Sequence, residues 1–402
     1  MAGNTHVVVI GGGYAGVMAA NRLTLRDDVT VTLVNPRPDF VHRVRLHQLV
    51  GGSDGAVIAY QDVLAERVRP VVDTVTRIDA AERRVTLAAD GTLDYDYLIY
   101  AVGSGSAEPS VPGAAGFAYP IATLEEARRL RPALDAAPAT ATVTVAGAGP
   151  TGIETAAELA EAGRTVTLVC GGVLGPYLHA RGRRSVAKRL AELGVTVLDG
   201  SGAKVTAVTR DAVRLADGRE LPSGVTVWTV GFRVPDLAAR SGLSTDAVGR
   251  LLTDETLTSV DDARVVAAGD AAAPSGLPLR MSCLNAMPLG ARAADTVLSR
   301  LAGEQPQNLR QSFYAQCVSL GRSAGVYQFA DRSDAAVWLH IGGGLGARVK
   351  ELVCRGIPEH LAEEAHKPGS FSLHRIPGGA AKRGRLLRAG RAQAPAAADR
   401  TA

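Results

Sequence analysis

The stretch VVVIGGGYAG, residues 7–16, decides the fold because it joins an apolar run to a G-x-G-x-x-G turn. The first glycine of such a turn permits a tight bend, the second lets the backbone approach a pyrophosphate, and the third lets a helix pack close to the strand. The pyrophosphate rests on free N–H groups at the helix start. A helix over 14–25 and a strand over 29–34 complete a predicted dinucleotide-binding unit. The residues expected at its cofactor are Gly11, Gly12, Gly13, Tyr14, Ala15 and Gly16.

A second stretch, VTVAGAGPTG at residues 143–152, repeats this order 136 positions later (147 − 11). It is followed by a predicted helix over 150–162 and a predicted strand over 165–169. One such motif is weak evidence, but two in the same strand–turn–helix context predict two dinucleotide sites, and two dinucleotides suggest electron transfer between them. The residues expected at the second cofactor are Gly147, Gly149, Thr151 and Gly152.

The position that normally binds a ribose hydroxyl through an acidic side chain is altered in both units. The first unit has Asn35, whose amide still donates and accepts hydrogen bonds but without the assistance of a charge. The second has Cys170, so neither the glutamate typical of NAD sites nor the arginine typical of NADP sites is present. Arg181, Arg183 and Arg184 would reach a 2′-phosphate only if the loop folded back, and a solvated helix face is the favoured interpretation.

Length and composition indicate a soluble protein of two or three domains. The chain has 402 residues, of which 46% are hydrophobic and 21% charged, and its net charge is +4. This small charge argues against nucleic-acid binding, and the 4% aromatic content argues against stacking of single strands. The four cysteines form no close pair, which excludes a local redox dithiol and predicts no metal site. No apolar run approaches the ~20 residues of a membrane span, so a cytoplasmic protein is expected.

The predicted fold class is α/β, with two Rossmann-like dinucleotide-binding domains, one inserted into the other, and a small α+β C-terminal domain. A late strand ends in Ala101-Val102-Gly103 in the first unit and in Thr229-Val230-Gly231 in the second, so the internal repeat covers whole domains. A third apolar strand ends in Gly269-Asp270, which puts a carboxylate at the sheet edge where ligands bind. The predicted domains are 1–112 with 244–315, the inserted 113–243, the C-terminal 316–376 and a disordered basic tail, 377–402.

Together these motifs resemble the pyridine-nucleotide-dependent FAD oxidoreductases, over about residues 5–355, and among them the type II NADH dehydrogenase-like proteins of actinobacteria. The resemblance implies FAD in domain 1–112 with 244–315, and NADH or NADPH in domain 113–243. It implies that Asp270 holds the ribityl chain of the flavin. It also implies that a helix beginning near Met287 and Leu289 directs its N–H groups at the flavin ring. Other residues expected beside the cofactors are Val75, Ala101, Gly103, Gly231 and Gly269.

Glu154 is the one residue for which the resemblance implies a catalytic role. It directly follows the second glycine turn, and in similar enzymes a glutamate here lies near the nicotinamide. The other interpretation is an ordinary carboxylate near a helix start, where the dipole favours negative charge. His42 and His47 receive no catalytic role, because a polar surface position or a satisfied core position is commoner for a histidine.

The chain departs from the resemblance in three places. Residues 40–47 contain no cysteine, whereas disulfide reductases of this group carry a cysteine pair there, so dithiol reduction is not expected. Leu284 and Leu289 stand where type II dehydrogenases carry glutamines that face the quinone. The membrane-bound members end in long amphipathic helices, but this tail offers only a short basic segment, 382–388. A solvated tail is therefore favoured over peripheral contact with the inner face of the cell membrane.

The resulting functional prediction is an NAD(P)H:acceptor oxidoreductase. Hydride passes from NAD(P)H to FAD, and electrons then pass to a quinone or another small organic acceptor. A flavoprotein that tailors one metabolite is an alternative, motivated by the two leucines. Another alternative is a flavoprotein that senses the redox state of the nicotinamide cofactor and turns over slowly, like the apoptosis-inducing-factor relatives. The sequence leaves a homodimer through the C-terminal domain open.

Overall fold

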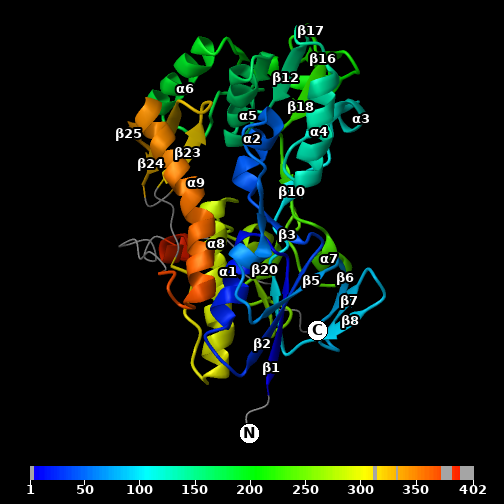
Figure 1. Ribbon diagram of the computed structural model, residues 1–402, viewed down its shortest axis with the longest axis vertical. Helices are drawn as coiled ribbons and strands as arrows, with labels where there is room; N and C mark the ends of the chain where they lie inside the picture. Colours follow the sequence, from blue (N-terminus) through cyan, green and yellow to red (C-terminus); the bar gives the residue numbers. More distant parts are fainter. Residues whose placement is uncertain (1–3, 311–314, 332–333, 373–382, 390–402) are drawn as a thin grey trace, which may run out of the picture.

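The structure is a computed structural model that describes residues 4–310, 315–331, 334–372 and 383–389. Two parallel sheets lie at opposite ends of an elongated molecule, and a long helix near the C-terminus runs along one side of it (Figure 1). Both sheets consist of five strands, with the strand that precedes a glycine turn in third place.

The first sheet has the order β21-β9-β1-β2-β5, and all its pairings are parallel. Ile10, the last residue before the glycine turn, lies opposite Val34 and Tyr100 in the two neighbouring strands. Strands β1 and β9 are almost wholly buried, as expected when helices cover both faces of a parallel sheet. The strands are β1 (Thr5–Ile10), β2 (Val29–Asn35), β5 (Val68–Val72), β9 (Tyr97–Tyr100) and β21 (Val265–Ala267).

The second sheet repeats this topology with the order β11-β18-β12-β13-β14, again entirely parallel. Each parallel sheet is accompanied by a three-stranded antiparallel sheet, β6-β7-β8 in one case and β15-β16-β17 in the other. The internal repeat predicted from the glycine turns therefore extends to strand order. The parallel strands are β11 (Ala118–Pro120), β12 (Thr142–Ala146), β13 (Thr165–Val169), β14 (Thr196–Leu198) and β18 (Val225–Trp228). The antiparallel strands are β6 (Val75–Asp79), β7 (Arg84–Leu87), β8 (Thr92–Asp94), β15 (Val205–Val208), β16 (Ala212–Leu215) and β17 (Glu220–Pro222).

The chain passes between the two halves twice, where β10 (Gly105–Ser106) pairs antiparallel with β19 (Phe232–Arg233). After the first crossing, α4 (Leu124–Ala136) begins with a capping box between Thr123 and Glu126. The remaining short elements are β3 (Asp39–Val41), α2 (Leu46–Gly51), β4 (Val57–Ala59), α3 (Ala114–Phe117), α7 (Leu237–Arg240), β20 (Leu251–Thr253) and β22 (Ala272–Pro274). The sheets and this pairing agree with an inserted second domain, but the predicted domain limits stay predictions.

Two helices position the first glycine turn. Helix α1 (Tyr14–Leu23) follows the turn and packs against α8 (Cys283–Leu301) in the largest apolar core. The crossing is close, since a Cβ on Gly290 would lie 2.2 Å from the backbone oxygen of Ala15. In the second half, α5 (Pro150–Glu161) follows the second turn, and α6 (Ala180–Glu192) lies farther along the chain.

The C-terminal region consists of an antiparallel sheet and a long helix. The strands are β23 (Ala315–Ser319), β24 (Gly325–Ala330) and β25 (Ala336–Ile341), and the helix is α9 (Gly343–His366). The sequence pattern by itself predicts strands over 326–329 and 336–340, close to the last two observed, but only a short helix over 346–353 in place of the 24 residues observed. Helix α9 is stabilised along its whole length by a buried stripe that packs on the neighbouring elements. The stripe consists of Gly346, Lys350, Cys354, Ile357, Leu361 and Glu364.

The prediction that 377–402 is disordered is wrong for residues 383–389, which are helical. Arg383 is almost fully buried, forms an ion pair with Glu255 and donates to the carbonyl oxygens of Pro274 and Leu277. A composition rule cannot anticipate that one arginine of a basic tail is buried against a carboxylate and two carbonyl oxygens. Residues 377–382 and 390–402 lie outside the described part. Among the described residues, no helix has both the length and the apolar character needed to cross a membrane.

Candidate functional site

A cavity lies at the carboxyl ends of the first sheet, where open α/β sheets bind ligands. It is formed by residues from both parts of the predicted FAD domain and by the first residues of the second half. The predicted cofactor residues that line it are Gly11, Gly12, Gly13, Tyr14, Ala15, Asn35, Val75, Ala101, Gly103, Gly269 and Asp270. The sequence therefore identified most of one continuous surface from residues spread over the chain.

The positions in the first turn differ in whether the protein itself requires a glycine there. A Cβ on Gly12 would lie 1.8 Å from the hydroxyl of Tyr60, and one on Gly16 would lie 1.8 Å from the oxygen of Gly11. Gly16 thus serves the packing of helix on strand and does not line the cavity. A Cβ on Gly13 would meet no heavy atom within 4 Å, and its φ of −88° suits any residue. The free space at Gly13, at the start of α1, fits a phosphate group held by backbone N–H groups.

The second turn repeats this arrangement. A Cβ on Gly147 would lie 2.3 Å from the Thr229 hydroxyl, and one on Gly152 would lie 2.0 Å from the oxygen of Gly147. A Cβ on Gly149 would again meet nothing within 4 Å. Thr151 is the second residue of α5, and Gly231 has a φ of +83° in the loop that follows Thr229. Both turns therefore leave the same open space at a helix start. Contact of these residues with a nicotinamide cofactor stays a prediction.

Asn35 lines the first cavity, but its side chain also supports the turn. Its Oδ1 accepts from the N–H of Gly12 at 2.9 Å, and its Nδ2 donates to the oxygen of Arg37 at 2.9 Å. One N–H and one lone pair of the amide are thus used by the backbone. The amide keeps one N–H and one lone pair, so its contact with a ribose stays a prediction, with a weaker bond expected than from a carboxylate.

Asp270 is held at the far side of this cavity by two residues that the sequence analysis missed. The Ser104 hydroxyl donates to Asp270 Oδ2 at 2.7 Å, and Arg43 Nη1 lies 3.8 Å from the same oxygen. Arg43 also donates to the oxygen of Ala122, so it links this wall to the second half. Ser104 could have been found, because it directly follows the turn that ends in Gly103.

Two predicted residues of the flavin helix contribute no side chain to the cavity. Helix α8 begins at Cys283, four residues earlier than expected, because the Ser282 carbonyl already accepts from Asn285 and Ala286. Met287 and Leu289 are 5% and 2% exposed in the core. The helix start expected near Met287 thus lies at Cys283, and contact of backbone N–H groups of this helix with a flavin stays a prediction. The lining residue from this helix is Ala286.

A buried chain of hydrogen bonds joins the first turn to α9. His42 Nε2 lies 3.0 Å from the Cys354 carbonyl oxygen, which can only accept, so Nε2 carries the hydrogen. Nδ1 then accepts from the Tyr14 hydroxyl at 3.2 Å. Burial, with a smaller contribution from Arg45, lowers the His42 pKa to about 4, so the ring is neutral near pH 7. His42 is thus a satisfied core histidine, one of the two positions expected.

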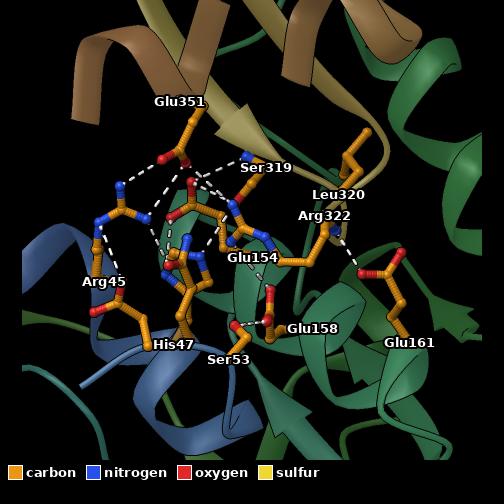
Figure 2. A network of polar contacts seen from close by, with 12 residues as sticks. Arg45, His47, Ser53, Glu154, Glu158, Glu161, Ser319, Leu320, Arg322 and Glu351 are labelled. Atoms are coloured by element: carbon orange, nitrogen blue, oxygen red, sulfur yellow. Dashed lines mark hydrogen bonds and ion pairs between the residues drawn. The ribbon is translucent and has the colours of Figure 1, made fainter. Parts of the chain in front are cut away.

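Glu154 lies at the centre of a second buried network, between α5, α2, β23 and α9 (Figure 2). Its Oε1 is 2.9 Å from Lys350 Nζ and accepts from the Ser319 N–H at 3.0 Å. His47 Nδ1 is 3.8 Å from the other oxygen. Burial by itself raises the Glu154 pKa, but Lys350 and then His47 reverse the effect, and the pKa lies below its ordinary value. Glu154 and Lys350 are therefore both ionised.

Lys350 was not found from the sequence, although a signal existed. It occupies the buried stripe of α9, where a lysine is expected only if it has a partner. His47, also in this network, is 4% exposed, and burial lowers its pKa to about 4. In the basic cluster on α6, Arg181 lies 5.3 Å from the ring centroid of Trp338 in the C-terminal sheet, whereas Arg183 donates to the carbonyl oxygen of Leu178, just before the helix.

Comparison with known proteins agrees with this geometry. Residues 5–290 match the family described as Pyridine nucleotide-disulphide oxidoreductase. An NADH dehydrogenase-like protein of Mycobacterium tuberculosis is 33% identical over 356 residues, which cover 80% of this chain and 87% of that protein. A type II NADH:quinone oxidoreductase of the same species is 29% identical over 370 residues, which cover 81% and 78%.

Solved structures show the same fold at low identity. The sulfide:quinone oxidoreductase of Aquifex aeolicus superposes with a TM-score of 0.76 at 20% identity, covering 90% of this chain and 92% of that one. NDH2 from Plasmodium falciparum, in complex with NADH, gives 0.75 at 15% identity, covering 93% and 100%. The chain therefore belongs to the pyridine nucleotide-disulphide oxidoreductase family, as an enzyme of the type II NADH dehydrogenase-like kind that uses FAD and NAD(H).

Proposed function

We propose that this protein oxidises NADH and passes the electrons through FAD to a small organic acceptor, for which a quinone is the leading candidate. The observation that carries the proposal is the pair of open helix starts at Gly13 and Gly149, on two sheets of identical topology. Both glycines have backbone angles open to other residues, and no protein atom requires their lack of a side chain. A bound phosphate at each turn explains both.

The residues proposed to hold FAD surround the first cavity. The turn at Gly13 binds the pyrophosphate, Asn35 contacts the ribose, and Asp270, oriented by Ser104 and Arg43, binds the chain between the ribose and the flavin ring. When bound, FAD supplies the redox chemistry, because it takes two electrons from NADH and releases them to the acceptor.

Glu154 is proposed to position the nicotinamide end of NADH. Its carboxylate is fixed by Lys350 and Ser319, so it presents a preorganised edge directly after the second turn. Because Lys350 forms an ion pair with Glu154, the two buried groups together carry no net charge. No described residue has to act as a nucleophile, since hydride passes directly between the two cofactors.

The test is an anaerobic titration of the FAD-loaded protein with NADH and then NADPH, followed by reoxidation with a short-chain quinone. Rapid bleaching of the flavin band by one nucleotide and rapid recovery with the quinone are expected. Reduction without recovery by any quinone would favour a metabolite-tailoring enzyme, which Leu284 and Leu289 motivated. A long-lived charge-transfer complex that turns over slowly with every acceptor would favour a nicotinamide sensor.

A further inference from the structure

A cleft of 570 Å³ opens beside the Glu154 network, apart from the cavity at the first glycine turn. Its walls come from three separate segments: the α2 region, the loop between β23 and β24, and one face of α9. Ser319 and Lys350 belong to this lining and also contact Glu154. The cleft therefore reaches from solvent to the buried ion pair.

Most of the charged side chains that line the cleft are cationic. Five cationic side chains line it, against two carboxylates, Asp54 and Glu351. Lys350 is neutralised from behind by Glu154, so the remaining excess comes from arginines. The cationic side chains are Arg45, Arg322, Arg348, Lys350 and Arg355.

One carboxylate is shared among three of these arginines, as Figure 2 shows for Arg45, Arg322 and Glu351. Glu351 accepts from Arg45 at 2.7 Å, from Arg355 at 2.8 Å and from Arg322 at 3.3 Å. A carboxylate has about four lone-pair sites, whereas each guanidinium has five N–H donors. Glu351 can therefore hold the arginines together but cannot satisfy them, and donors remain for another acceptor.

Arg322 and Arg348 have the weakest compensation. The second contact of Arg322, with Glu158 Oε2, is 3.7 Å long, beyond hydrogen-bond distance, and burial raises the pKa of Glu158. Arg348 is exposed and has no ion pair or side-chain hydrogen bond with any residue of the described part. It lies three and seven residues before Glu351 and Arg355, on the same face of α9.

We propose that this cleft binds a small organic polyanion, with at least two carboxylate or phosphate groups, between Arg322 of the loop and Arg348 of α9. Guanidinium forks from different segments suit a ligand with more than one anionic group, because each fork binds such a group bidentately. The volume suits a small metabolite. The proposal does not depend on the identity of the electron acceptor.

Isothermal titration calorimetry on the FAD-loaded protein at low ionic strength tests the proposal, with citrate and inorganic pyrophosphate as separate probes. Binding of citrate alone assigns polycarboxylates, and binding of pyrophosphate alone assigns phosphates. In R348Q and in R322Q the dissociation constant should rise about tenfold or more, the loss expected for a charge-assisted hydrogen bond. R348Q is the more decisive variant, since that side chain is exposed and forms no ion pair or side-chain hydrogen bond within the described residues.

R210Q is the matched control, because Arg210 is an exposed arginine in the turn between β15 and β16. It removes the same charge and should bind both probes as the wild type does. The proposal is overturned if neither probe binds, if R210Q weakens binding as much as R348Q does, or if both cleft variants bind normally. If both cleft variants bind normally, the measured heat of binding belongs to another site, such as the second glycine turn. Flavin reduction by NADH, measured separately, tests the proposed function independently.

Discussion

At the residue scale, glycines within one turn serve different purposes. Gly16 is required by the protein itself, since a Cβ there would lie 1.8 Å from the oxygen of Gly11. Gly13 is required only if a ligand occupies the space beside it. The sequence motif contains both and cannot separate them, because the distinction depends on which atoms surround each position.

Replacing Gly13 by alanine should therefore weaken FAD binding at least about tenfold while the apoprotein melts close to the wild-type temperature. Replacing Gly16 by alanine should destabilise the apoprotein by about 1–3 kcal/mol or more through overpacking. Thermal unfolding of both apoproteins and a titration with FAD give the comparison. Equal destabilisation by the two substitutions would contradict the assignment of Gly13 to a ligand.

His42 makes stability depend on pH. Its pKa is about 4 in the folded protein, against about 6.5 in an unfolded chain, so the unfolded state binds a proton first as the pH falls. Its contribution is fully present above pH ~6.5 and is lost between pH ~6.5 and ~4, about 2 kcal/mol of it between pH 7 and pH 5. Urea unfolding of wild type and H42Q across this range is the measurement. The variant should be less stable at pH 7 but less sensitive to pH, and identical slopes would refute the account.

At the element scale, the sequence predicted the regions that have strong local patterns. Strands β1 and β12, their turns and helices α1 and α5 have apolar runs and glycine spacing, and their bounds differ from the prediction by a residue or two. The start of α8 and the length of α9 were not predicted correctly. The Ser282 carbonyl starts α8, and the stripe through Lys350 extends α9. The residues that pack against this stripe lie far away in the sequence, so the local pattern of 343–366 does not predict the length of the helix.

The contact between α5 and α9 depends on the buried pair Glu154 and Lys350. Removing one partner, in E154Q or K350M, leaves an uncompensated buried charge and should cost about 3–5 kcal/mol. The double variant should be more stable than the sum of the two losses implies, because neither charge remains. A double-mutant cycle from urea unfolding measures this coupling. Additive losses would show that the two groups do not interact in solution.

At the scale of the whole molecule, the repeat of two dinucleotide domains was predictable because each domain carries its own motif. The contacts between segments that are distant in sequence could not be predicted. Lys350 forms an ion pair with Glu154, 196 positions away along the chain (350 − 154), and Arg322 and Arg348 line one cleft that exists only in the folded protein. Such arrangements follow from how three segments pack, and no local pattern in any one of them specifies the others.

The most direct test of the central claim is anaerobic reduction of FAD-loaded wild type and G149A by NADH, followed in a stopped-flow spectrometer. Gly149 lies in the second turn, where a Cβ meets no protein atom but would enter the space assigned to the nucleotide. G149A should keep FAD and melt as the wild type does, yet require at least about tenfold more NADH for half-maximal reduction. Wild type that NADH does not reduce, or G149A reduced as easily as wild type, would contradict the account.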